Sequence, residues 1–193
     1  AAFGLLAALA RPTGLFLALP VLVEAWRHRR ELVGAARVGV LAAIAAPAVG
    51  VGSYLLWVGS RYGDRLLPLR VQDDLRGGAA FPPLRLIEGL GEIVTDPLGD
   101  GLHVPFAFGI VALAWVAWKR LPPAWAALSI VTAAACLTAD NLNSVERYAY
   151  GSVPMIVALA VVAEGRRWRP AVALSSAIFI GMATMAWYGS YVP

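Results

Sequence analysis

The polar residues with the clearest chemical use stand together in "DNLNSVERYAYGSV", residues 140–153, between two apolar stretches. The guanidinium of Arg147 can present paired N–H groups to two oxygens of a phosphate. Its neighbours Asn143, Glu146 and Tyr148 carry groups that hydrogen-bond to sugar hydroxyls, and Ser144 stands beside them. The same stretch also suits a belt of polar and aromatic anchors at a membrane surface. Asn143, Ser144, Arg147 and Tyr148 are candidate substrate-binding residues, and anchoring is the alternative.

A second candidate is Arg11 in "ARPTG", residues 10–14, where an arginine and a proline interrupt an apolar sequence. A charged side chain close to the hydrocarbon of a bilayer is costly unless it reaches the surface or finds a partner. Arg11 is therefore expected either to bind the phosphate of a lipid-linked substrate or to anchor the chain at the interface.

Charges of both signs are mixed in "GSRYGDRLLPLRVQDD", residues 59–74. The sequence does not assign a catalytic residue. Within this segment Asp64 is the candidate base, and the alternative role of its carboxylate is to orient Arg61. Arg61 and Gln72 are candidate contacts to an anionic head group and its sugar. The alternative is a solvated loop whose ion pairs each contribute under about 1 kcal/mol.

Other kinds of chemistry have little support in the residues present. Cys136 is the single cysteine and lies in an apolar stretch, so we expect a buried hydrophobe and no disulfide. His28 and His103 lack the spacing of metal ligands, although a carboxylate-held Mg²⁺ or Mn²⁺ stays open. Neither a phosphate-binding loop nor a dinucleotide fingerprint occurs, so no cofactor is expected. The net charge of +4 sits in short clusters between apolar segments, so nucleic acid is not an expected partner.

The composition predicts a membrane protein that must hold these polar groups on helices. Hydrophobic residues make up 60% of the chain and charged residues 15%, against roughly 45–50% and about 25% in soluble domains. The apolar blocks suit transmembrane helices. We expect an all-α polytopic bundle forming one transmembrane domain, residues 1–193. It has a partial segment at Ala1–Ala10 and six spans: Thr13–Trp26, Gly34–Val58, Leu102–Trp118, Pro123–Ala139, Ser152–Glu164 and Pro170–Tyr188. Because "AAFGLLAALA" starts inside an apolar segment, we expect a piece of a longer protein.

Charge predicts the orientation of this bundle. One set of connections, around residues 27–37, 119–120 and 166–169, carries nine of the 16 basic residues, and these are expected in the cytoplasm. The alternate set, residues 59–101 and 140–151 with Arg11, carries nine of the 12 acidic residues. The candidate site residues all fall on this outer side. The chain is therefore expected in the cell membrane with its site facing outward.

The long outer connection, residues 59–101, is expected to contain helices that lie on the membrane surface. The sequence "PPLRLIEGLGEIV" places Leu84, Ile87 and Leu90 on one helical face and Arg85 and Glu92 on the other. A shorter amphipathic piece, "LPLRVQDDLRGGAA", precedes it and ends at a glycine pair.

Three short motifs resemble those of the PIG-V-like mannosyltransferases of actinobacteria, which are glycosyltransferases of the GT-C type. The motifs are Arg11-Pro12-Thr13-Gly14, Tyr62-Gly63-Asp64, and Ser144-Val145-Glu146-Arg147-Tyr148 with Pro154 beyond. The chain departs from the family in two ways. Arg65 stands where a proline is expected, and the outer loop that carries the family's catalytic acid is not in this sequence.

The resemblance implies inverting transfer of mannose from a polyprenyl-phosphate donor to a lipid or glycan acceptor on the outer face, without a bound nucleotide. It implies that Arg11 and Arg147 bind the lipid phosphate. It also implies that Gln72, Asn143 and Tyr148 bind sugar hydroxyls. Tyr62, in the second motif, is a further candidate substrate-binding residue. Two other classes stay open, a transporter or flippase-like protein and a non-catalytic membrane subunit. The near absence of charged residues within the spans disfavours an ion-coupled transporter.

Overall fold

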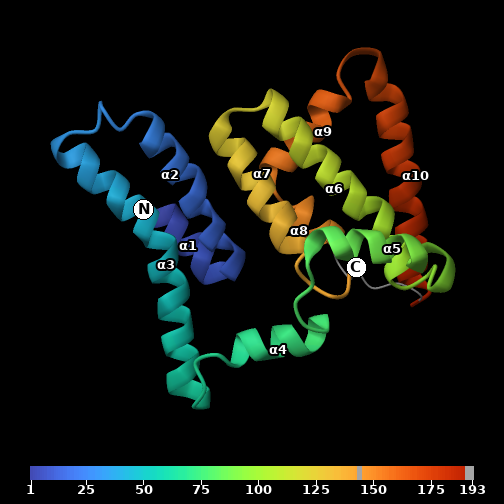
Figure 1. Ribbon diagram of the computed structural model, residues 1–193, viewed down its shortest axis with the longest axis horizontal. Helices are drawn as coiled ribbons and strands as arrows, with labels where there is room; N and C mark the ends of the chain where they lie inside the picture. The colour runs from blue at the N-terminus through green and yellow to red at the C-terminus, as the bar shows by residue number, and fades with distance from the viewer. Residues whose placement is uncertain (143–144, 190–193) are drawn as a thin grey trace.

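The computed structural model describes residues 1–142 and 145–189, and over these ranges the chain is helical without a strand, as the sequence predicts (Figure 1). Two of the helices, η1 and η2, are of the 3₁₀ type. In chain order the elements are α1 Ala2–Ala10, η1 Pro12–Leu17, α2 Ala18–Arg27, α3 Gly34–Tyr62, α4 Leu67–Arg76, α5 Pro82–Thr95, α6 Asp100–Arg120, α7 Pro123–Cys136, α8 Val145–Ala149, α9 Val153–Val162, η2 Gly165–Arg167 and α10 Trp168–Trp187.

Within the described residues, three helical segments are long and apolar enough to cross a membrane: α3 with 29 residues, α6 with 21, and η2 with α10, which together have 23. At about 1.5 Å per residue, each reaches the roughly 30 Å of a hydrocarbon core. The other predicted spans form shorter apolar helices, 14 residues in α7 and 10 in α9. Three of the six predicted spans therefore have the length of a crossing.

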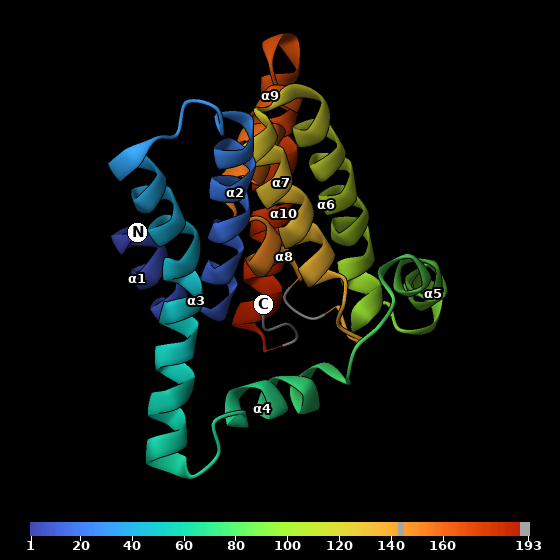
Figure 2. The same ribbon diagram turned by 60° about the vertical axis from the view of Figure 1, so that its left-hand side comes forward.

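The predicted span Thr13–Trp26 is divided between η1 and α2, and it follows a chain reversal (Figure 2). Arg11 is extended, with φ −149° and ψ 136°, because the residue before a proline is pushed out of the helical region. A Cβ at Gly14 would lie 2.5 Å from backbone atoms of Ala7, so only glycine allows η1 to pack this closely on α1. The "ARPTG" segment is thus the turn of a helical hairpin.

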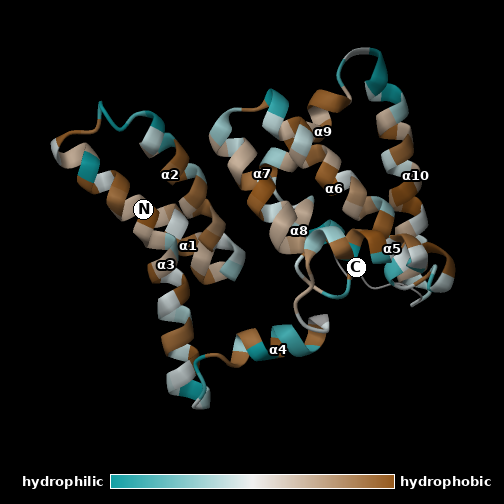
Figure 3. Cartoon of the chain, in the orientation of Figure 1, coloured by the Kyte–Doolittle hydropathy of each residue, from teal (hydrophilic) through white to brown (hydrophobic). Residues whose placement is uncertain are grey.

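The buried core lies in the C-terminal half, where α6 packs against α7, α8 and α9. Its centre contains Ile110, Leu142 and Met155, surrounded by alanines that let the helices approach closely. By contrast, α10 has no buried residue, and Phe179 on it is 73% exposed. Many large apolar side chains on the long helices are exposed, as expected of a membrane protein. Hydrophobic residues recur along these helices in Figure 3.

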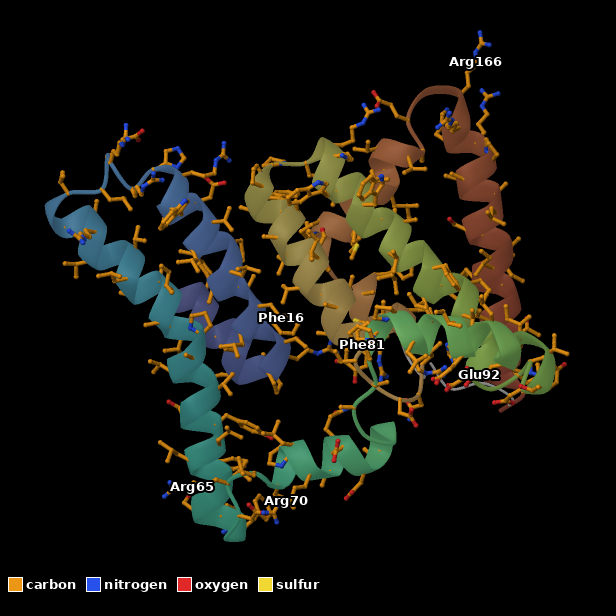
Figure 4. The ribbon with its side chains drawn as sticks, viewed as in Figure 1. Phe16, Arg65, Arg70, Phe81, Glu92 and Arg166 are labelled. Carbon is orange, nitrogen blue, oxygen red and sulfur yellow. The ribbon has the colours of Figure 1, made fainter. Side chains whose placement is uncertain are left out.

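The two ends of the molecule differ in the way that the charge pattern predicts. The connections α2–α3, α6–α7 and α9–α10, which include the labelled Arg166, lie at one end (Figure 4). Helices α4 and α5 lie at the other end, where Arg65, Arg70 and Glu92 are labelled. Below, these are called the basic end and the α4–α5 end.

Helices α4 and α5 confirm the two predicted amphipathic segments, and α4 ends at Gly77 and Gly78, both with positive φ. The environment of α5 differs from the prediction. Most of its apolar residues face outward, including Ile87 at 65% exposure. Arg85, in contrast, is 2% exposed and is buried against Asp100 of α6 and the backbone of Asp140. Arg85 on the polar face of α5 therefore holds the helix to the protein, and most of its apolar face is exposed.

Candidate functional site

A cavity of about 1900 Å³ opens between the hairpin of α1, η1, α2 and α3 on one side and α7, α8 and α9 on the other. Helix α4 contributes the wall at the α4–α5 end. Because η1 and α2 also pack directly on α7, the two halves of the chain are joined along this cavity. We call it the groove.

The groove brings together four predicted site residues that are distant in sequence: Arg11, Gln72, Arg147 and Tyr148. Arg11 is held at the hairpin turn by its backbone, since its N–H donates to the carbonyl of Ala7 at 2.9 Å. Arg147 and Tyr148 come from the short helix α8, and the guanidinium carbon of Arg147 lies 5.3 Å from the centroid of the Tyr148 ring. Two permanent cations thus line one cavity.

Two lining residues at the same end were missed by the sequence analysis as site residues. Asp73 follows Gln72 on α4 and adds a carboxylate to the groove. Ser152 also lines it, and within the described part of the chain its buried Oγ has no hydrogen-bond partner. Both residues stood in segments already singled out, Asp73 in the charged stretch 59–74 and Ser152 in the polar run 140–153, so their polarity was the available signal.

The rest of the groove is largely apolar. Leu15, Phe16 and Val21 line it from the hairpin and Leu128 from α7, and Figure 4 shows Phe16 on the side of η1 that faces α7. The lining continues along α2 as far as Glu24 and His28 near the basic end. His28 is tied there by its Nδ1, 3.5 Å from a carboxylate oxygen of Glu24. A groove with two arginines toward one end and a long, largely apolar body fits a ligand with a charged head and a hydrocarbon chain.

A buried pair fixes helix α8. His103 Nδ1 lies 2.7 Å from Glu146 Oε1, and the two side chains are 2% and 13% exposed. The other carboxylate oxygen, Oε2, is buried and has no hydrogen-bond partner among the described residues. The pKa of the nearby Tyr150 phenol is raised above its usual value, first by burial and then by the charge of Glu146. With Glu146 held toward α6, the next two residues line the groove.

A second buried cluster fixes the loop before α8. Arg85 Nη2 lies 2.8 Å from Glu92 Oε2 and 2.6 Å from Asp100 Oδ2, and Arg85 Nε donates to the carbonyl of Asp140. Burial alone would lower the pKa of Arg85, but the hydrogen bonds and negative charges of the two carboxylates raise it overall. Asp100 also accepts a hydrogen bond of 3.1 Å from the N–H of Leu142. We call this set the Arg85 cluster; it ties α5, α6 and the loop together.

The same loop is joined to the connection between α4 and α5. The N–H of Ala80 donates to the carbonyl of Thr138 at 2.7 Å, and the N–H of Asp140 donates to the carbonyl of Gly78 at 3.2 Å. Asn141 Nδ2 donates to the carbonyl of Leu75 at 2.9 Å. These bonds set where α4, and therefore Gln72, meets the groove.

Three candidate residues lie outside the groove. Helix α3 continues to Tyr62, which carries Arg61 and Tyr62 beyond the groove lining as exposed residues. Asp64 pairs with Arg70 at 3.0 Å, not with Arg61, and accepts the N–H of Leu66 at 2.9 Å. In this structure Asp64 therefore stabilises the turn into α4. Two further candidates, Asn143 and Ser144, lie outside the described residues.

Within residues 1–142 and 145–189, no three His, Cys, Asp or Glu side chains are grouped closely enough to hold a metal ion. Comparison with known proteins adds no assignment: no family model, curated protein or solved structure matches the chain.

Proposed function

We propose that this chain forms the lipid-phosphate binding part of a membrane glycosyltransferase, with mannose as the sugar suggested by the sequence motifs. The observation that carries the proposal is the groove, in which Arg11 and Arg147 stand near the α4–α5 end of a long apolar cavity. A polyprenyl-phosphate sugar has the matching form, an anionic head on a long hydrocarbon chain. Its phosphate would meet the two arginines, and its prenyl chain would lie along Leu15, Phe16 and Leu128.

The proposed placement in the membrane puts the basic end in the cytoplasm and the α4–α5 end outside, in a multi-pass arrangement. It is supported by the three helices of crossing length and by the gathering of the three basic connections at one end. The shorter helices α7 and α9 would complete the bundle beside them. With this orientation the polar part of the groove opens toward the outer surface.

The proposed reaction is a single displacement with inversion. The acceptor hydroxyl attacks the anomeric carbon and gives its proton to a carboxylate, while the bond from that carbon to the phosphate oxygen breaks and the lipid phosphate leaves with the electron pair. Arg11 and Arg147 stabilise the charge that develops on the phosphate. Gln72 and Tyr148 are placed to bind sugar hydroxyls. Asp73 is the groove-lining carboxylate at this end, and the sequence motifs direct attention to an upstream outer loop for a further acid.

Titration of the full-length protein with a polyprenyl phosphate tests the proposal. Arg147→Lys and Arg11→Lys keep the charge but lose the paired N–H groups, so each should weaken binding and lower transfer by at least about tenfold, or ~1.4 kcal/mol. Arg61→Lys is the matched control, because Arg61 is exposed and lies outside the groove lining. Equal binding of polyprenyl phosphate and polyprenol, or equal losses in all three variants, would refute a phosphate site.

A second function, movement of a lipid between the leaflets, is favoured by one feature of the groove. Its lining extends from Arg11 and Arg147 to Glu24 and His28 near the basic end, so polar groups line both ends of one cavity. In proteoliposomes, a fluorescent prenyl-phosphate lipid would then cross the bilayer without any sugar transfer. Sugar transfer without crossing supports the enzyme.

A further inference from the structure

A smaller cavity of about 730 Å³ lies at the basic end, away from the polar part of the groove. It is formed where the end of α6 meets the end of α9 and η2, and it shares no lining residue with the groove. The positive φ of Gly165, +70°, reverses the chain here and brings η2 beside α6. We call it the basic pocket.

Three cations line the basic pocket from two separate segments: Lys119 and Arg120 on α6 and Arg167 on η2. Within the described part of the chain none of the three is in an ion pair, and all are exposed. Lys119 Nζ lies 4.6 Å from the centroid of the Trp115 ring, which holds the ammonium at the pocket. Glu164 is the one acidic residue in the lining, so the pocket keeps a positive balance.

The pocket also has an apolar wall. Val116 on α6 and Val161 and Val162 on α9 line it, and Trp115 is 61% exposed beside them. Tryptophan favours the boundary between lipid head groups and hydrocarbon, with its ring in contact with both. The basic pocket therefore offers cations and an apolar surface in one place, and its volume lies within the roughly 300–1,000 Å³ of ligand pockets.

We propose that the basic pocket binds the phosphate-bearing head group of an anionic phospholipid from the leaflet at the basic end. Lys119, Arg120 and Arg167 would contact the phosphate, and the first part of the acyl chains would lie on the valines. Cations that only set topology need to be on the correct side of the membrane, and they need not converge on a cavity. Basic pockets between membrane helices suit such head groups. This site is separate from the groove and does not depend on the proposed transferase activity.

The test uses the full-length protein in detergent micelles and a short-chain anionic phospholipid with a single phosphate. A phospholipid with a zwitterionic head group and inorganic phosphate serve as the two comparison ligands. We expect the anionic phospholipid to bind at least tenfold more tightly than either. Equal binding of inorganic phosphate would overturn the lipid assignment, and equal binding of the zwitterionic lipid would overturn the charge assignment.

Variants that remove a positive charge and a variant that removes a negative charge should change binding in opposite directions. Lys119→Gln and Arg167→Gln should each weaken binding several-fold, whereas Glu164→Gln should strengthen it, because it removes repulsion between a carboxylate and the phosphate. Arg30→Gln is the control, an exposed cation at the same end outside the pocket lining. A loss in Arg30→Gln as large as in Lys119→Gln, or weaker binding in Glu164→Gln, would show that the pocket does not recognise the head group.

Discussion

Replacing Arg85 with methionine tests the Arg85 cluster most severely, because the new side chain has a similar length but no charge and no donor. The change leaves the carboxylates of Glu92 and Asp100 without their cation and the carbonyl of Asp140 without its donor. Removing one partner of a buried ion pair costs about 3–5 kcal/mol. Since Glu92 and Asp100 keep 29% and 18% of their side-chain exposure, water offsets part of this loss. We expect a decrease near the lower limit, about 3 kcal/mol.

The assay is the free energy of unfolding in mixed detergent micelles, measured by titration with a denaturing detergent. Arg70→Met provides the control, because it removes an ion pair with Asp64 whose side chains are 69% and 31% exposed. Loss of that exposed pair should cost less than about 1 kcal/mol. If Arg85→Met and Arg70→Met lower the unfolding free energy equally, the cluster does not hold the loop, and the placement of α8 needs another cause.

Three other predictions concern packing, titration and topology. Gly50→Ala should lower the unfolding free energy by about 1–3 kcal/mol, because the added Cβ would lie 2.6 Å from a carbonyl oxygen of α1. Gly52→Ala on the same helix is the control: its Cβ would meet nothing within 4 Å, so the unfolding free energy should not fall. Because burial raises the pKa of Tyr150, folding favours its neutral phenol. The contribution of the neutral phenol to stability is complete below the unfolded-state pKa near 10.0, and it is lost as the pH rises toward the higher folded-state pKa. Stability should therefore fall above pH 10, and Tyr150→Phe should reduce that fall. A cysteine at Gly77 should react with an impermeant reagent added outside intact cells, and a cysteine at Trp168 should not.

Helix ends could be predicted from the sequence where a residue with special backbone preferences marks them. The glycine pair at Gly77 and Gly78 ends α4 as expected, and both residues have the positive φ that glycine allows. Helix α3 continues past Val58, where the predicted membrane span ends. The polar residues that follow continue the helix as far as Gly63, whose φ of +79° stops it. Polarity alone does not end a helix, whereas a left-handed backbone conformation does.

Which face of a helix meets the protein could not be read from periodicity. The heptad-like spacing of α5 separates Arg85 and Glu92 from Ile87, but in a membrane the apolar face can turn toward lipid and the polar face toward protein. The burial of Arg85 follows from partners on α6 and the following loop, which are set by the tertiary fold. Sequence charge alone does not reveal such partners.

The candidate site could be predicted in part, because the charge pattern placed Arg11, Gln72 and Arg147 at the same end of the bundle. It could not show which acid lines the groove. Asp64 and Asp73 lie in one charged segment, and only the turn before α4 decides that Asp73 faces the groove while Asp64 pairs with Arg70. The sequence shows that both residues are acids, but only the path of the chain through the turn shows which of them lines the groove.

Photo-crosslinking tests the central claim most directly, that the groove holds a lipid phosphate by its head and its chain. The probe is a prenyl phosphate with a photoreactive group in the hydrocarbon chain, added to the full-length protein and mapped by mass spectrometry. Labelling should concentrate on groove residues such as Phe16 and Leu128, and excess polyprenyl phosphate should prevent it while polyprenol should not. Labelling spread over exposed apolar positions outside the groove, such as Phe179, or no protection by polyprenyl phosphate, would contradict the account.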